Sequence, residues 1–176
     1  IKDPSYIEKR SFEIITEELG HINLPERESK IIKRIIHTTG DFEFARLTSI
    51  SSDFIDAFMD SIRRGNSIFT DTTMAQAGIN KRALEKYGSR VDCFIADEDV
   101  AYAAKTEGTT RSMAAVKKAV MDGRHKLFVF GNAPTALVQL KEEMSKGFKP
   151  DAIIGVPVGF VGAAESKEEL LLLGVP

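Results

Sequence analysis

The sequence predicts an α/β fold in which a mostly parallel sheet is flanked by helices, an α/β/α sandwich with additional N-terminal helices. Two observations predict it. The chain opens with helical patterns, and from residue 52 onward short apolar runs alternate with amphipathic stretches, which is the pattern of βαβ units. No internal repeat, low-complexity tract or Pro/Ser-rich linker divides the 176 residues, so we expect residues 1–176 to form a single domain.

The N-terminal part of the chain predicts two helices. The first begins near Pro4 and continues with roughly helical apolar spacing until Gly20, which can stop a helix. The second begins at Pro25 and carries an apolar stripe of period three to four, made of Ile31, Ile32, Ile35 and Ile36. This stripe places His37 at the end of the second helix, directly before a Thr-Thr-Gly-Asp loop.

Strands and helices alternate in the remainder of the chain. Ser52 or Asp53 can cap a helix that runs to Gly65, because both side chains offer an oxygen to the unpaired N–H groups of the first turn. The candidate strands are Ser67–Thr70, Val91–Ala96, Leu127–Gly131 and Ala152–Val156. Between them lie helical patterns at Lys81–Tyr87, Ser112–Met121 and Ala136–Met144.

Composition excludes several classes of function. The 24 basic and 26 acidic residues give a net charge of −2, so nothing attracts the chain generally to nucleic acid or to an anionic membrane. A single cysteine, Cys93, cannot form an internal disulfide. No apolar run approaches the roughly 18 residues of a membrane helix, and no secretory signal is present, so we expect a cytoplasmic protein.

The loops that follow the strands are the candidate site, because ligands bind at the carboxyl ends of parallel strands. These loops are residues 71–74, 97–99, 131–135 and 157–162. In the third loop, Pro134 suits a first helical turn and Thr135 offers a hydroxyl to a ligand, although the same residues also suit a capped turn without a ligand. The glycines of the fourth loop lack the spacing of a dinucleotide or phosphate-binding motif.

Two other side chains are candidates for chemistry. Arg111 follows the candidate cap Thr110, and its charge opposes the helix dipole; this indicates carboxylate binding, with a solvated surface arginine as the alternative. His37 suits proton transfer because imidazole titrates near neutral pH, with helix capping or packing as the alternative. The other two histidines, His21 and His125, are expected in surface loops. Because the three lie far apart in the sequence, we expect no metal site.

Five segments, in this order, resemble the motifs of the precorrin-8X methylmutase family. They are His37–Asp41, Asp71–Met74 with Gly78–Ile79, Thr110–Ser112, Gly131–Leu137 and Pro157–Lys167. The resemblance runs from about residue 6 to residue 176. Members of the family continue past the equivalent of Gly174–Pro176 into a glycine-rich segment and a final helix, so we expect the domain to lack its C-terminal segment.

The resemblance implies an isomerase of cobalamin (vitamin B12) biosynthesis. Such an enzyme moves a methyl group between two adjacent carbons of ring C in a corrin precursor, giving hydrogenobyrinate, or cobyrinate in the cobalt route. It implies no cofactor, and it implies a homodimer because members of the family are similar in being homodimers. A non-catalytic corrinoid or tetrapyrrole carrier on the same fold is the alternative. A nucleotide-dependent enzyme is disfavoured because the phosphate-binding motifs are missing.

The family's catalytic histidine corresponds to His37, which is implied to protonate the macrocycle or to hydrogen-bond to it. The substrate carries many carboxylates around a large apolar ring, so its site should combine cationic and backbone donors with an apolar floor. Phe160 and Met74 are expected to contribute to that floor. The expected substrate-binding residues are Thr39, Gly40, Asp71, Thr73, Met74, Arg111, Ser112, Gly131, Asn132, Thr135, Gly159 and Phe160.

Overall fold

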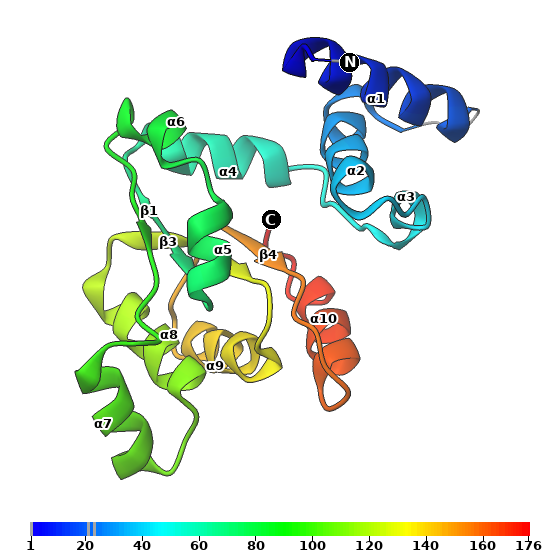
Figure 1. Ribbon diagram of the computed structural model, residues 1–176. Coiled ribbons are helices and arrows are strands. Elements are labelled where there is room, and N and C mark those ends of the chain that lie inside the picture. The colour runs from blue at the N-terminus through cyan, green and yellow to red at the C-terminus, as the bar shows by residue number, and fades with distance from the viewer. Residues whose placement is uncertain (1, 21, 23) are drawn as a thin grey trace. The chain divides into compact units, whose positions relative to one another are not determined.

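The computed structural model describes residues 2–20, 22 and 24–176 (Figure 1). The chain divides into two compact units, Ile1–Ser52 and Asp53–Pro176, and each is described by itself. The expectation that residues 1–176 form one domain stays a prediction. His21 lies outside the described residues, as does the prediction made for it.

The first unit is helical. Helix α1 (Pro4–Leu19) begins after Asp3, whose side chain accepts a hydrogen bond from the backbone N–H of Ser5 at 3.0 Å, and ends at Gly20. Helix α2 (Glu26–Thr39) follows Pro25, and α3 spans Phe44–Leu47. The predicted bounds of α1 are confirmed, and α2 begins as predicted but continues two residues beyond His37, to Thr39. Their apolar stripes form a small core that contains Ile15, Leu19, Ile32, Ile36 and Ala45.

The second unit is built on a sheet of four parallel strands in the order β2-β1-β3-β4. The strands are β1 (Ser67–Thr70), β2 (Val91–Asp92), β3 (His125–Phe130) and β4 (Ala152–Gly155). The helices are α4 (Phe54–Arg63), α5 (Thr73–Gly78), α6 (Lys81–Glu85), α7 (Glu98–Glu107), α8 (Arg111–Asp122), α9 (Pro134–Ser145) and α10 (Ala163–Leu171). The predicted parallel sheet is therefore confirmed.

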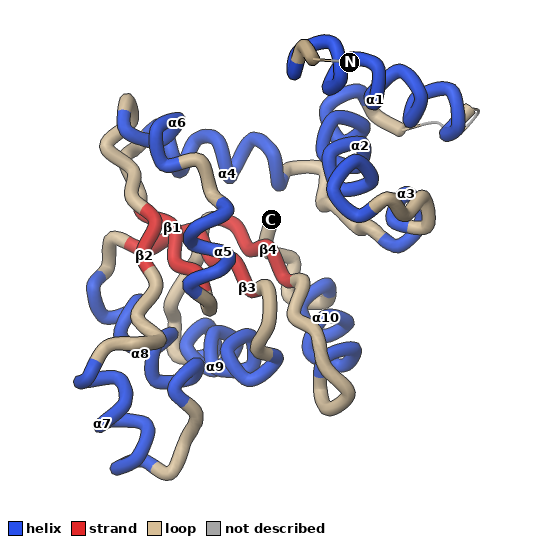
Figure 2. The backbone as a smooth tube through the Cα atoms, in the orientation of Figure 1, coloured by secondary structure: helices blue, strands red, loops and turns tan. Residues whose placement is uncertain are grey.

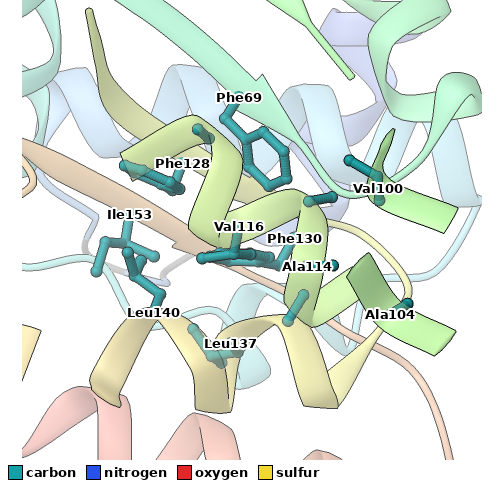
Figure 3. Packing of buried hydrophobic residues seen from close by; sticks show 13 residues of the cluster. Phe69, Val100, Ala104, Ala114, Val116, Phe128, Phe130, Leu137, Leu140 and Ile153 are labelled. Atoms are coloured by element: carbon teal, nitrogen blue, oxygen red, sulfur yellow. The ribbon is translucent and has the colours of Figure 1, made fainter. Parts of the chain in front are cut away.

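Successive side chains of each strand point to opposite faces of the sheet, so β1 and β3 contribute to two separate cores. On one face, Phe69, Phe128 and Phe130 pack against apolar residues of α7, α8 and α9 (Figure 3). On the other face, Ile68 and Leu127 pack against residues of α4 and α6. The tube drawing shows the red strands of this unit between these two helical layers (Figure 2). This arrangement is the α/β/α sandwich that the sequence predicts.

Three of the four predicted strands differ in detail from the structure. Strands β3 and β4 end at Phe130 and Gly155, each one residue before the predicted end. Strand β2 stops at Asp92 instead of continuing to Ala96, because only Val91 and Asp92 pair with β1. Strand β3 begins at His125 instead of Leu127, and His125 is completely buried instead of lying in a surface loop. Its Nε2 lies 3.0 Å from a carboxylate oxygen of Asp92, and its ring meets that of Phe94 edge-on. Its Nδ1 is buried without a hydrogen-bond partner among the described residues.

Four helices of the second unit, α4, α6, α8 and α9, have ends close to those predicted, whereas the sequence predicts no helix at α5, α7 or α10. Asp53 occupies the N-cap position of α4, although its side chain makes no capping hydrogen bond there. Thr110 caps α8 as predicted, and Pro134 stands in the first turn of α9. None of the helices in the described part of the chain is both long and apolar enough to cross a membrane.

Candidate functional site

The candidate site of the second unit lies at the carboxyl ends of three neighbouring strands. The backbone hydrogen bonds of the sheet continue past the last strand residues into the loops. The N–H of Asp71 donates to the carbonyl of Val129 at 3.2 Å, and the N–H of Val156 donates to Phe130 at 2.9 Å. One bond lies farther out, from the N–H of Val158 to the carbonyl of Asn132 at 3.2 Å. The loops after β1, β3 and β4 are thus held to one another.

Asp71 stands at the centre of these loops and is 1% exposed. Its Oδ1 accepts a hydrogen bond from the N–H of Gly131 at 2.9 Å. Its Oδ2 accepts from the N–H groups of Asn132 at 2.9 Å and Ala133 at 2.7 Å. Both oxygens act only as acceptors, as those of an ionised carboxylate do, and three hydrogen bonds compensate for the burial of the charge.

Thr73 and Met74 lie in the first turn of α5, directly after this buried carboxylate. The hydroxyl of Thr72 accepts from the N–H of Ala75 at 3.1 Å and so caps the helix. The hydroxyl of Thr70 donates to the carbonyl of Thr72 at 3.1 Å, which fixes the turn from the strand side. Both Thr73 and Met74 are exposed, and Met74 presents a thioether chain to the surface.

The first turns of α8 and α9 meet through two threonine side chains. The hydroxyl of Thr110 accepts from the N–H of Met113 at 3.1 Å and lies 3.3 Å from the hydroxyl of Thr135. Arg111 is exposed and Ser112 is half-buried. Within the described part of the chain, Arg111 makes no ion pair, so its guanidinium is available to an external anion.

The loop between β4 and α10 is apolar and exposed. Its members Val156, Val158, Phe160 and Val161 are all exposed, and Phe160 is exposed completely. At Gly159, where φ is 154°, a Cβ atom would lie 3.7 Å from Pro134 at the start of α9. Phe160 and Met74 therefore each offer exposed apolar surface in a segment that follows a strand, as a floor for an apolar ring requires.

His37 stands in the last turn of α2, in the first unit, with Thr39 and Gly40 directly after it. Its ring stacks on that of Phe12, with centroids 5.3 Å apart. The hydroxyl of Thr39 donates to the carbonyl of Ile35 at 2.9 Å and accepts from the N–H of Asp41 at 3.2 Å. Gly40 adopts the left-handed conformation that ends α2.

The side chain of His37 is exposed, and we find no hydrogen bond from its ring nitrogens to any described residue. The packing role that the sequence analysis gives as an alternative for His37 applies to the face of its ring, which stacks on Phe12. The nitrogens at its edge are free for proton transfer. The ten other candidates lie in the second unit.

Metal binding finds no support among the described residues, where no three or more His, Cys, Asp and Glu side chains form a group that could hold an ion. The charged cluster of the second unit is instead an ion-pair network in which Lys118 contacts Asp97 and Asp99 at 2.7 Å each. The Lys118 ammonium hydrogen-bonded to Asp99 lowers the pKa of that carboxyl.

Known proteins resemble this chain over nearly its whole length. The family model described as precorrin-8X methylmutase matches residues 6–176. A cobalt-precorrin-8 methylmutase of Salmonella typhimurium is 47% identical over 176 residues, covering 97% of this chain and 82% of that protein. A protein of the same name from Priestia megaterium is 44% identical over 174 residues, covering 98% of this chain and 77% of that one.

A solved structure has the same fold. It is that of a precorrin-8X methylmutase from Thermus thermophilus, which superimposes with a TM-score of 0.88 at 35% sequence identity. The match covers 98% of this chain and 84% of that one.

Proposed function

This chain belongs to the precorrin-8X methylmutase family, and on that premise we propose that it moves the ring-C methyl group of cobalt-precorrin-8 to an adjacent carbon, giving cobyrinate in cobalamin biosynthesis. The observation that carries this proposal is the family match over residues 6–176. The chain is a methylmutase, an isomerase, and the comparisons give no support to a non-catalytic carrier, because the relatives are named as enzymes.

Cobalt-precorrin-8 is proposed over the metal-free precorrin-8X because the two relatives at 47% and 44% identity are both named for the cobalt form. The proposed site residues do not need to contact the metal, because it lies at the centre of the ring. A preference for the cobalt form would therefore depend on the shape and charge of the ring. Comparing the rates with the two substrates measures this preference.

His37 is the proposed proton donor. An intramolecular methyl shift needs neither a nucleophile nor a redox group, but it is easier when the macrocycle is protonated or hydrogen-bonded at the correct atom. The stacking on Phe12 supports this role, because it restrains the plane of the imidazole of an exposed side chain. Thr39 and Gly40, directly after it, are proposed to contact the substrate.

The loops of the second unit are proposed to bind the substrate. Arg111 is the proposed partner of a ring carboxylate, since it is exposed and makes no ion pair within the described part of the chain. Met74 and Phe160 are proposed to contact the apolar ring. The remaining proposed contacts in this unit are Thr73, Ser112, Gly131, Asn132, Thr135 and Gly159.

We also propose that the protein is a cytoplasmic homodimer. The apolar loop that contains Val156, Val158, Phe160 and Val161 supports an association of some kind, because contiguous exposed apolar residues are uncommon on proteins that have no partner. Sedimentation at several protein concentrations tests this: a mass of twice 19.4 kDa is expected, and a monomer at all concentrations would contradict it.

Incubation of the purified protein with cobalt-precorrin-8 tests the proposed activity. An isomerisation changes the visible absorption bands, because the conjugation of the ring changes, and it leaves the molecular mass unchanged. The expected result is a full conversion of the spectrum at constant mass, faster than with precorrin-8X. Saturable binding of both compounds without conversion would contradict the proposal and indicate a carrier.

A further inference from the structure

We infer that Asp71 is a positioning residue for the proposed reaction, one that holds the substrate-binding loops in place without itself touching the substrate. The inference rests on the proposed function, because one of its tests measures the activity of the enzyme. It replaces the simpler expectation that the Asp71 carboxylate binds the ring. Four observations carry it: the burial of Asp71, the three hydrogen bonds that its carboxylate accepts, the contacts of residues 131–135 with two further loops, and the negative charge of the carboxylate.

All the hydrogen bonds that the Asp71 carboxylate accepts come from backbone N–H groups of the protein. The side chain is 1% exposed, and its two oxygens accept the N–H groups of Gly131, Asn132 and Ala133 at 2.7–2.9 Å. Because the side chain is buried, a substrate atom could reach the carboxylate only if the residues that cover it moved. A substrate carboxylate would in addition be repelled by the charge of Asp71.

The three N–H groups are those that an anionic ligand would otherwise use. Successive backbone N–H groups between a strand and a helix form a concave anion site in many α/β proteins. In this chain the site is filled by the protein's own carboxylate, which comes from the neighbouring strand end. The carboxylates of the ring must therefore find other donors, and this is a physical reason to assign one of them to Arg111.

The loop held by Asp71 is connected to two further loops. The carbonyl of Asn132 accepts the N–H of Val158, which leads into the apolar segment with Gly159 and Phe160. Three residues after Asn132, the hydroxyl of Thr135 lies 3.3 Å from that of Thr110, which caps α8 beside Arg111. A shift of residues 131–133 would thus be passed on to the loops that carry Arg111 and Phe160.

The substitution Asp71→Asn tests this geometry sharply. The carbonyl oxygen of asparagine can replace only one carboxylate oxygen, and the amide NH2 then takes the place of the other. If the NH2 replaces Oδ1 it faces the N–H of Gly131, and if it replaces Oδ2 it faces two N–H groups. In either orientation at least one pair of donors points at each other, so the loop must move.

Asp151→Asn is the matched control. Asp151 also accepts several hydrogen bonds through one carboxylate oxygen, from Ser61 at 2.6 Å, Arg64 at 2.7 Å and Asn66 at 3.1 Å. It precedes β4, at the end of the sheet opposite to the candidate site. In Asp151→Asn the carbonyl oxygen of asparagine can take the place of this one oxygen and accept the same three bonds. The control therefore removes the charge of a hydrogen-bonded carboxylate without moving the substrate-binding loops.

The experiment compares KM, kcat and the dissociation constant of cobyrinate among the wild-type chain, Asp71→Asn and Asp151→Asn at a temperature at which all are folded. For Asp71→Asn we expect KM and the dissociation constant to rise about tenfold or more, the effect of one lost charged hydrogen bond, with the pH profile of kcat unchanged. For Asp151→Asn both constants should stay within about twofold of wild type, even if its melting temperature falls as much as that of Asp71→Asn.

Amide hydrogen exchange supplies a second readout that needs no ligand. In Asp71→Asn the amides of residues 131–133 and Val158 should lose protection, while those in the middle of β3 keep it. If Asp71→Asn does not fold, Asp71→Glu keeps the charge but lengthens the side chain, and it should raise KM in the same direction.

Wild-type affinity and KM in Asp71→Asn would overturn the inference, as would the same loss in Asp151→Asn. A wild-type chain that neither binds nor converts corrin compounds would overturn the proposed function. In that case the exchange of residues 131–133 still decides whether Asp71 holds the loop.

Discussion

The imidazole ring of His37 lies stacked on the phenyl ring of Phe12, with the ring centroids 5.3 Å apart and the planes inclined by 23°. Phe12 belongs to α1 and His37 to α2, so the contact joins the two longest helices of the first unit. The guanidinium of Arg34 lies 4.7 Å from the centre of the same phenyl ring. Phe12 therefore orders two cationic or potentially cationic side chains on the exposed surface of α2.

Replacing Phe12 by leucine should lower kcat about 2- to 10-fold, because an aromatic pair contributes about 0.5–1.5 kcal/mol beyond its buried area. Product affinity should change little, since Phe12 orients the proposed proton donor and is not proposed to contact the ring. Steady-state kinetics with a cobyrinate titration measure both. The control is Phe42→Leu, the same exchange at a partly exposed ring of the first unit. An equal effect in both variants would assign the loss to general loosening of that unit.

Removing the side chain of Arg111 should weaken the binding of the polycarboxylate product by about 1.5–3 kcal/mol, the contribution of one hydrogen bond to a charged group. A titration of Arg111→Ala followed through the visible bands of cobyrinate gives this number. Lys117→Ala is the control, because Lys117 lies on the same helix and pairs with Glu107. Unaltered affinity in Arg111→Ala would place this residue outside the binding site.

The pair of Asp122 and Arg124 predicts a specific dependence of stability on pH. The Arg124 side chain hydrogen-bonds to both oxygens of Asp122 and lowers the pKa of that carboxyl. The stabilisation is thus fully present above the unfolded-state pKa of about 3.9, and it is lost as pH falls through the lower folded-state pKa.

The melting temperature of Asp122→Asn should accordingly lie below that of the wild-type chain at neutral pH, and the two should converge in acid. Thermal unfolding between about pH 2 and 7 measures this. Asp3→Asn, which alters an exposed carboxylate at the start of α1, serves for comparison. A difference that grows as the pH falls would contradict the assignment.

The core between the sheet and α7–α9 should be sensitive to the loss of one aromatic side chain. Phe128 is completely buried, with ring centroids 5.6 Å from Phe69 and 5.6 Å from Phe148. Phe128→Ala should lower the free energy of unfolding by about 3–5 kcal/mol, because the lost contacts and the cavity both cost stability. Met121→Ala, at an exposed position of α8, should change it by no more than about 0.5 kcal/mol. Denaturant titrations compare them, and equal effects would contradict this packing.

Much of the fold could be predicted because its signals are local. Helix α2 follows Pro25, carries a regular apolar stripe and ends at a glycine in the left-handed conformation. Strand β1 is a short buried run between Asn66 and Asp71, and its bounds agree with the prediction. In both elements the residues that start and stop the structure are adjacent to it in the sequence.

The errors concern features that depend on distant residues. The apolar run that begins at Val91 resembles a longer strand, but its pairing with β1 ends at Asp92, although β1 itself continues to Thr70. His125 looks like a loop residue in its charged neighbourhood, but its ring is buried in contact with Asp92, 33 positions earlier, and with Phe94. Such pairings follow from strand order, which a local pattern does not contain.

The candidate site shows the same division. Its loops could be located from the sequence, because ligand sites follow the ends of parallel strands. The role of Asp71 could not, since its hydrogen-bond partners lie 60–62 positions farther along the chain. The sequence does contain a pattern that indicates this role. An acidic residue, Asp71, directly follows one strand, and a turn that begins with Gly131 follows another strand that could be its neighbour.

The most direct test of the proposed mechanism is the rate of conversion of cobalt-precorrin-8 by the wild-type chain, His37→Asn and the neighbouring control Thr38→Ser, measured across pH with saturating substrate. If His37 donates the proton, the wild-type rate falls as pH rises through the range in which imidazole loses its proton. His37→Asn should then lose most of its turnover and this pH dependence while it retains product affinity, and Thr38→Ser should behave as wild type. A wild-type rate and pH profile in His37→Asn would contradict the account.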